Sequence, residues 1–101
     1  MKHYRVELSP EALGHAHHIR GWWRENREAS PDLFVDELAR ALQKLERFPH
    51  LGPAYPRAEI EGMRRFLLPQ SRYHVYYTLV EDTDTVRVHA IWHIARIEPL
   101  V

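Results

Sequence analysis

The chain has 101 residues, of which 45% are hydrophobic, so it has the length and composition of one globular domain. We expect a single domain over residues 1–101 with one core, which excludes a multidomain enzyme and a disordered tail. Fourteen Lys and Arg residues balance fourteen Asp and Glu residues, so no bulk positive charge attracts nucleic acid or a membrane. Eight histidines make the net charge rise as the pH falls through about 6.5.

Cysteine is absent, which excludes disulfides, thiolate catalysis and cysteine-ligated zinc or iron–sulfur centres. The longest stretch without Asp, Glu, Lys or Arg is the nine residues Phe48–Pro56, whereas a membrane-spanning helix needs about 20 apolar residues. No apolar run follows the first five residues, so we expect no signal peptide. The expectation is a cytoplasmic protein without a membrane segment.

A short strand and a helix are predicted at the N-terminus. Apolar and charged residues alternate over 3–8, which is typical of a half-buried strand. Ser9-Pro10-Glu11 is a helix start, because Ser caps backbone N–H groups and Pro fits the first turn. We expect this helix to reach about Arg27. Its buried stripe is predicted to be Leu13, Ala16, Ile19 or Arg20, and Trp23.

Ser30-Pro31-Asp32 repeats the helix start signal, and Pro49 marks the end of the second helix. The period of the apolar residues between them is the clearest in the chain: Phe34, Leu38, Ala41, Leu45 and Phe48. Only Glu28 and Ala29 separate the two predicted helices. We therefore expect them to fold back on each other as an antiparallel hairpin.

Residues 49–62 are rich in Pro and Gly and form a connector. Three apolar runs follow, at Met63–Leu68, Arg72–Val80 and Thr85–Ile94, and residues 81–84 form a polar turn between the last two. The predicted fold class is α+β: an N-terminal strand, an antiparallel helical hairpin, then three antiparallel strands (β-α-α-β-β-β). The helices are expected to pack on one face of an antiparallel sheet.

The register of the last two strands follows from their apolar residues, which must share the face that packs on the helices. The expected opposed pairs are Tyr73 with Trp92, Val75 with Ala90, Tyr77 with Val88, and Leu79 with Val86. The other face is then expected to pair Arg72 with His93, His74 with Ile91, Tyr76 with His89, and Thr78 with Arg87. This predicts a polar face with three histidines, a tyrosine and two arginines.

Two sets of side chains on this half of the chain are functional candidates. Arg64, Arg65 and Arg72 lie in a stretch without acidic residues, and guanidinium groups bind phosphate well. The alternative is that they serve solubility or bond to helix ends, and the adjacent Arg64 and Arg65 point to opposite faces. The histidines His74, His89 and His93 suit acid–base chemistry on a ribose 2′-OH, and Tyr76 suits stacking on a base.

The alternative for these histidines is a polar face that a partner segment covers. A three-histidine metal site is conceivable, but no carboxylate on this face would orient the imidazoles, so no metal is assigned. In the first helix, His15 and His18 are expected on a solvated face. Trp22 and Trp23 point about 100° apart, so we expect one of them at a rim or interface.

Six short motifs succeed one another along nearly the whole chain. They are Val6-Glu7-Leu8-Ser9-Pro10-Glu11-Ala12, Phe34-Val35-Asp36-Glu37-Leu38, Leu45-Glu46-Arg47-Phe48-Pro49-His50-Leu51-Gly52, Gly62-Met63-Arg64-Arg65-Phe66, Tyr73-His74-Val75-Tyr76-Tyr77 and Trp92-His93-Ile94-Ala95-Arg96. In this order they resemble the RelE/ParE superfamily of toxins from bacterial type II toxin–antitoxin systems, in particular its ParE-like and plasmid stabilisation members.

The resemblance implies a cytoplasmic toxin that a cognate antitoxin protein holds inactive, without a cofactor and without a small-molecule substrate. ParE-like members are described as poisoning DNA gyrase, and RelE-like members cleave mRNA on the ribosome. His74 stands where many relatives have Arg in a Tyr-Arg-hydrophobic-X-Tyr pattern. The ending His93-Ile94-Ala95-Arg96 resembles the His-Gly-X-Arg ending of the ParE type, which favours the gyrase branch.

From these patterns we expect the target to be bound by Arg64, Arg65, Arg72, His74, Tyr76, His89, His93 and Arg96, and the antitoxin by Trp22 and Trp23. An ion pair of Arg96 with a nearby glutamate is the alternative role for that residue. The rival hypothesis is a metal-independent, ribosome-dependent mRNA endonuclease that uses His74 or His93 with Arg64, Arg72 and Arg96. A third hypothesis is a non-toxic relic that still binds an antitoxin.

Overall fold

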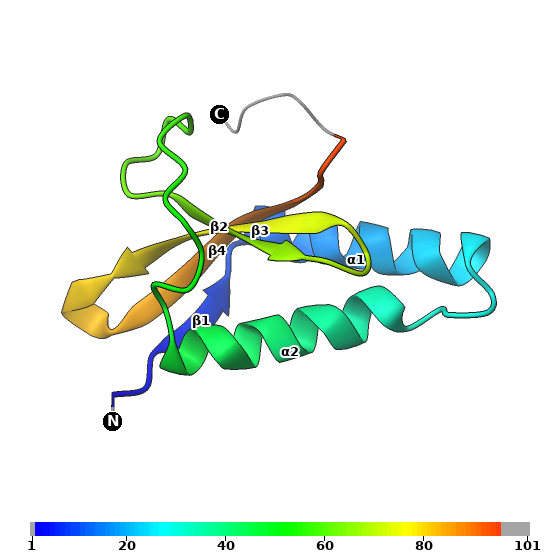
Figure 1. The fold of residues 1–101 in the computed structure, drawn as a ribbon, viewed down its shortest axis with the longest axis horizontal. Coiled ribbons are helices and arrows are strands. Elements are labelled where there is room, and N and C mark those ends of the chain that lie inside the picture. Colours follow the sequence, from blue (N-terminus) through cyan, green and yellow to red (C-terminus); the bar gives the residue numbers. More distant parts are fainter. Residues whose placement is uncertain (1, 96–101) are drawn as a thin grey trace.

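The computed structural model describes residues 2–95 and contains two helices and one four-stranded sheet (Figure 1). In chain order the elements are β1 (Arg5–Leu8), α1 (Pro10–Asn26), α2 (Leu33–Arg47), β2 (Arg64–Leu68), β3 (Tyr73–Val80) and β4 (Thr85–His93). A short 3₁₀ turn over Glu81–Thr83 joins β3 to β4. The predicted α+β order of elements is confirmed, with each strand within two residues of its expected limits.

The sheet has the order β1-β4-β3-β2 and is mixed. Strands β2, β3 and β4 are antiparallel as predicted. β1 runs parallel to β4, with Val6 beside Val86, so the expectation of a wholly antiparallel sheet is wrong for this strand. A parallel neighbour requires a long crossover between the two strands. Here the crossover includes both helices and the β2–β3 hairpin.

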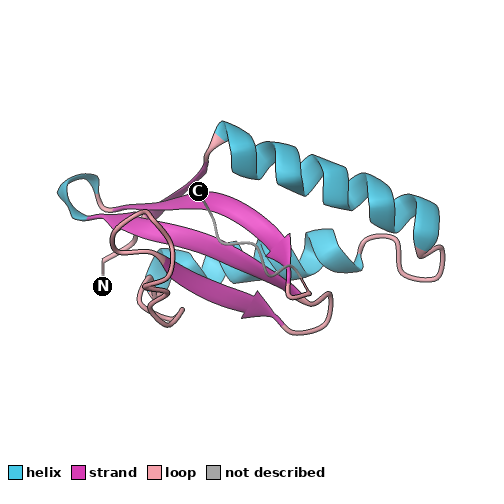
Figure 2. Ribbon diagram, turned by 90° about the horizontal axis from the view of Figure 1, so that it is seen from above, coloured by secondary structure: helices cyan, strands magenta, loops and turns pink. Residues whose placement is uncertain are grey.

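The two helices pack against one face and one edge of the sheet. Figure 2 shows α2 beneath the strands and α1 beside the edge that β1 and β4 form. The main core between these layers includes Phe34 and Leu45 of α2 and Val75 and Tyr77 of β3, all fully buried. This arrangement confirms the predicted burial of the β3 apolar face against the helices.

The N-terminal cap of α1 is as expected, whereas its buried stripe and the start of α2 differ from expectation. Ser9 caps α1 as predicted, accepting a hydrogen bond from the Ala12 backbone N–H at 3.0 Å. The buried stripe of α1 runs through Ala12, Ile19 and Trp23, so Leu13 is exposed, because neighbouring helix positions point about 100° apart. Asp32, rather than Ser30, occupies the N-cap position of α2.

Phe48 comes after the last helical residue of α2 and is exposed, so the predicted apolar stripe ends one turn early. The connection between the helices spans residues 27–32 and is therefore longer than the two residues expected.

A β-bulge in β4 changes the register of the β3–β4 pair. From the turn inward the predicted pairs are present, including Leu79 with Val86 and Tyr77 with Val88. Beyond them one extra residue, His89, enters β4, so that Tyr76 lies opposite Ala90, Val75 opposite Ile91, His74 opposite Trp92 and Tyr73 opposite His93. A one-residue shift exchanges the two faces. Ile91 consequently joins the main core, and the predicted core positions of Ala90 and Trp92 are wrong.

The sheet face away from the helices carries a second, smaller apolar cluster. The connector folds back along β2, with Tyr55 N–H donating to the Met63 carbonyl at 2.7 Å and Ala54 bridging to Arg64. Met63, Tyr76 and Ala90 are buried in this cluster, and Tyr55, Ala58 and Trp92 pack against it. In Figure 1 the connector, in green, stands on the side of the sheet away from α2. The expected open polar face is thus partly covered by the chain itself.

The end of α2 is tied to the sheet by the hydroxyl of Tyr77. This buried hydroxyl donates to the Pro49 carbonyl at 2.8 Å and accepts from the Gly52 N–H at 2.8 Å. A Cβ on Gly52 would lie 2.7 Å from the Arg65 carbonyl oxygen, so only glycine fits there. The Arg64 guanidinium adds bonds to the carbonyls of Gly52 at 2.7 Å and His50 at 3.2 Å.

We predict that Tyr77→Phe lowers the free energy of unfolding by about 1–3 kcal/mol, because it leaves a buried N–H and a buried C=O without a partner. Urea unfolding followed by circular dichroism measures the loss. The matched control is Tyr4→Phe, whose hydroxyl bonds to the exposed Glu81 carboxylate and should cost less. Equal losses in the two variants would contradict the prediction.

Candidate functional site

The predicted target-binding residues do not share one face. His74 lies on the face away from the helices, where its ring contacts Tyr76 with centroids 5.9 Å apart. His93 lies on the other side, edge-on to the core residue Tyr73 at 5.2 Å, and its Nδ1 accepts the Ala95 N–H at 3.1 Å. The bulge at His89 causes this separation. The prediction that His74 and His93 crowd one polar face is therefore wrong.

Tyr76 is enclosed rather than open to a ligand. It is only 4% exposed. The rings of Tyr55, His74 and Trp92 surround it, with centroids at 5.3, 5.9 and 6.1 Å. Arg65 lies over the Tyr55 ring at 4.4 Å and donates to the Tyr76 hydroxyl at 3.4 Å. The expectation that Tyr76 offers a stacking surface for a base is wrong, and the basic group here is the half-buried Arg65 above the aromatic cluster.

Two histidines of this face have lowered pKa values. Burial is the main cause of the lowered pKa of His74, and the positive charge of Arg65 adds to it. Burial also lowers the pKa of His89, again with help from a cation, Arg87, and against the opposing effect of Glu11. Folding therefore lowers the pKa of both imidazoles, which disfavours their protonated forms.

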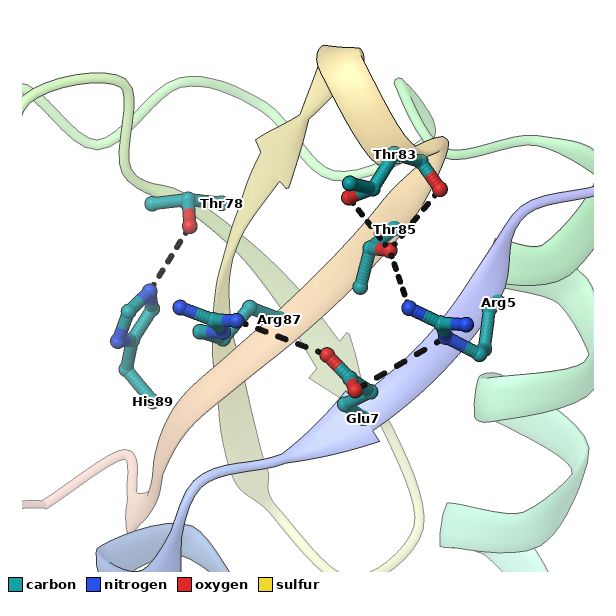
Figure 3. Close-up of polar contacts among 7 residues, drawn as sticks. All are labelled: Arg5, Glu7, Thr78, Thr83, Thr85, Arg87 and His89. Atoms are coloured by element: carbon teal, nitrogen blue, oxygen red, sulfur yellow. Dashed lines mark hydrogen bonds and ion pairs between the residues drawn. The ribbon is translucent and has the colours of Figure 1, made fainter.

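The side chains around His89 form polar contacts across three strands (Figure 3). His89 Nε2 and Thr78 Oγ1 are 2.8 Å apart. Glu7 of β1 lies between two cations, 3.6 Å from Arg87 and 3.8 Å from Arg5. The Thr78 contact orients the bulged residue His89, and the Glu7 carboxylate offsets part of the positive charge of Arg5 and Arg87 at this edge.

Arg64 and Arg72 have different environments. The guanidinium of Arg64 is bonded to carbonyls of the chain that follows α2. This agrees with the alternative role expected for these arginines, bonding to the end of a helix. Arg72 is exposed and ends the β2–β3 turn in the left-handed region, with φ of 71°. Its N–H donates to the Leu68 carbonyl at 2.8 Å, and its C=O accepts from Ile94 N–H at 2.9 Å. This places Arg72 beside the end of β4 and near His93. Arg96 lies outside the described residues.

Glu37 of α2 is a buried residue that the sequence analysis did not single out. Its carboxylate accepts three hydrogen bonds from the β2–β3 turn: Gln70 N–H at 2.7 Å, Ser71 N–H at 2.8 Å and Ser71 Oγ at 2.6 Å. Its position in the sequence does indicate burial, because Glu37 falls on the apolar stripe of α2 between Phe34 and Ala41.

A pocket of about 250 Å³ lies between α1 and the end of β4. Its lining residues are His15, His18, Ile19, Trp22, Tyr73, Ile91, Trp92 and His93. Trp22 is 41% exposed on its wall, whereas Trp23 is 8% exposed and belongs to the core. Of the two tryptophans expected to bind an antitoxin, only Trp22 is therefore placed for contact with a partner.

The pocket lies where β1 stops pairing with β4. Beyond Val88, side chains near α1 replace a strand: Ser9 Oγ donates to the His89 carbonyl at 3.3 Å, and His15 Nδ1 accepts the Ile91 N–H at 3.2 Å. His15 is thus a structural contact, and the expectation of a purely solvated face is wrong for it. Within residues 2–95 no three His, Asp or Glu side chains are grouped for a metal ion, and no helix could cross a membrane.

Comparison with known proteins gives one family and several similar folds. The family model of the ParE toxin of type II toxin–antitoxin systems (parDE) matches residues 6–98. No curated protein sequence matches the chain. Among solved structures, the chromosomal ParDE system from P. aeruginosa is similar with a TM-score of 0.73 at 12% identity, covering 90% of this chain and 96% of that one.

Two toxin–antitoxin complexes of the RelBE type share the fold as well. The E. coli RelBE complex has a TM-score of 0.60 at 16% identity, covering 92% of this chain and 99% of that one. RelBE2 from Mycobacterium tuberculosis has a TM-score of 0.59 at 18% identity, with coverages of 90% and 98%. The fold is therefore common to toxins named for both types.

The lowered pKa values of His74 and His89 predict an acid-sensitive fold. The unfolded chain takes up protons near pH 6.5 before the folded protein does, so stability is complete above this pH and declines below it. We expect replacement of both His74 and His89 by Gln to flatten the decline in urea midpoint between about pH 7.5 and about pH 5. His17→Gln, on the exposed side of α1, is the control. The prediction would be wrong if the urea midpoint of the double variant declined with pH as steeply as that of the wild type.

Proposed function

The chain belongs to the family of ParE toxins of type II toxin–antitoxin systems, and from this premise we propose that it arrests growth by binding a protein target, DNA gyrase, in the cytoplasm. A cognate antitoxin neutralises it. The proposed target surface is the basic end of the sheet where β3 begins and β4 ends, with Arg72 and His93, extended over the outer face by His74 and Arg65. Arg96, which lies outside the described residues, is proposed to bind the same target.

The main reason to prefer binding over RNA cleavage is that His74 and His93 lie on different sides of the sheet. General acid–base cleavage needs a base and an acid on one phosphodiester, each within hydrogen-bond reach. His74 and His93 face opposite sides of the sheet, and His93 Nδ1 is bonded to a backbone N–H. Tyr76 is buried, and Arg64 is bonded to carbonyls of its own chain. These contacts support a surface that binds, rather than a centre that transfers protons.

We propose that the antitoxin occupies the pocket between α1 and β4. Trp22 gives it an exposed aromatic wall, and exposed apolar groups next to a cavity favour a protein partner. Within residues 2–95 no strand pairs with β4 beyond Val88 on the β1 side; Ser9 and His15 bond to its backbone there, so the partner segment is proposed to enter the pocket that His15 lines rather than to add a strand to this edge. The structures of ParDE and RelBE named above come from systems with an antitoxin, which agrees with such a partner.

The target proposal predicts a graded loss of toxicity. Single replacements Arg65→Ala, Arg72→Ala, His74→Ala and His93→Ala should each cost about 0.5–3 kcal/mol of target binding, as truncations in an interface do. The measurement is survival after induction, compared with early gyrase-linked DNA breakage and early mRNA integrity. Ribosome-dependent mRNA cuts in the wild type, abolished by one histidine replacement, would move the protein to the nuclease class. Absence of any growth arrest would favour the non-toxic relic.

The antitoxin proposal predicts that Trp22→Ser weakens the complex with the protein encoded beside this gene by about tenfold or more, since a buried aromatic anchor is worth more than about 1.4 kcal/mol. Titration calorimetry measures the affinity. Leu13→Ser is the matched control, because Leu13 is an exposed apolar residue of α1 that does not line the pocket. Both variants should keep the wild-type Tm, and equal affinities for the two would refute the assignment of the pocket.

A further inference from the structure

The β2–β3 turn is held more rigidly than a surface turn needs to be. It spans residues 69–72 between the buried residues Leu68 and Tyr73. The Glu37 carboxylate binds both inner residues of the turn, with three hydrogen bonds of 2.6–2.8 Å to Gln70 and Ser71. The hydrogen bonds of Arg72 to Leu68 and Ile94 fix the last residue. Five hydrogen bonds therefore hold three residues of the turn, Gln70, Ser71 and Arg72.

Arg72 occupies a backbone position that favours glycine. Its φ of 71° lies in the left-handed region, where a Cβ is strained and where turns ordinarily use Gly or Asn. Of the other two left-handed positions within residues 2–95, one is a glycine, Gly62 with φ of 80°, and the other is Asp84 with φ of 50°, a residue type with a short polar side chain that tolerates this region. Strained non-glycine residues that the surrounding structure holds in place are concentrated at functional sites. The strain at Arg72 indicates that the side chain itself is needed there.

The side chain of Arg72 is presented to solvent, with no charged partner in the described part of the chain. It is exposed, and within residues 2–95 it forms no ion pair, whereas Arg5, Arg24 and Arg87 each lie near a carboxylate. The Glu37 carboxylate of α2, which binds this turn, already accepts three hydrogen bonds from Gln70 and Ser71. A fixed guanidinium binds a carboxylate with two parallel hydrogen bonds, and fixing it beforehand lowers the entropy cost of binding.

We propose that Glu37 is a positioning residue for target recognition: it holds the β2–β3 turn so that the Arg72 guanidinium meets a carboxylate of the protein target. This inference rests on the proposed function, because it assumes a protein target at this end of the sheet. Glu37 acts through the turn and does not contact the target. Arg72 makes the contact with the target. Its backbone is strained because a cationic side chain, rather than glycine, occupies this left-handed position.

The first test separates stability from toxicity at Arg72. Arg72→Gly relieves the left-handed strain, so its Tm should equal or exceed that of the wild type. Survival after induction should nevertheless rise at least about tenfold, the change expected when an arginine hot spot is lost. Arg72→Lys keeps the charge without the planar fork and should give intermediate killing. Wild-type killing by Arg72→Gly, at equal soluble protein, overturns the proposal.

The second test is a double-mutant cycle between Glu37 and Arg72. In Glu37→Gln the amide oxygen still accepts from Ser71, but the NH₂ group faces the Gln70 N–H, donor against donor. This change should lower killing several-fold in the wild-type background and have no further effect in the Arg72→Gly background. A purely structural role for Glu37 would lower killing equally in both backgrounds, which would overturn the proposal.

Controls keep the cycle interpretable. Asp36→Asn removes an exposed carboxylate from the neighbouring position of α2 and should leave killing unchanged. Ser71→Ala removes one hydrogen bond to Glu37 and replaces Glu37→Gln if that variant is poorly soluble; the same dependence on Arg72 is expected. A wild type without growth arrest would instead refute the proposed function itself, so the two failures are distinguishable.

Discussion

One extra residue in β4 determines which side chains of this protein act together. Up to Tyr77 the hairpin follows a regular register, and after His89 each residue of β4 lies on the face opposite to that expected without the bulge. Ile91 enters the core, Trp92 packs toward Tyr76, and His93 turns toward the α1 pocket. Without the bulge, the histidines would have gathered on one face, and an acid–base centre would have been geometrically reasonable. The preference for a binding surface depends on this local irregularity.

The elements of the fold were predictable because their signals are local. The α2 period and the Ser9 cap predict helices, and the polar turn between two apolar runs predicts the β3–β4 hairpin, whose register near the turn is confirmed. The bulge was not predictable because Ala90, Ile91 and Trp92 are all apolar. Alternation identifies a face only where apolar and polar residues alternate. Three consecutive apolar residues fit either face equally well.

The candidate site was predictable in part. Its exposed members Arg65, Arg72 and Trp22 were named from residue type and spacing, and the structure leaves all three at least partly exposed. The errors concern burial. Tyr76 is covered because the connector folds over the sheet, and Glu37 is important because its hydrogen-bond donors come from a turn more than 30 residues away. A buried carboxylate is tolerated only where donors surround it, and no local pattern shows such distant partners.

The parallel pairing of β1 with β4 affects the order in which the protein takes shape during synthesis. Among the strands of residues 2–95, β1 is translated before the others and its partner β4 after them, so Val6 cannot pair with Val86 until the rest of the sheet has been synthesised. Contacts this distant in sequence form late, because the intervening chain must be ordered first. The α1 pocket needs β4 for one wall and is incomplete until then. Until β4 has left the ribosome, the nascent chain accordingly lacks both the finished end of the sheet and this pocket.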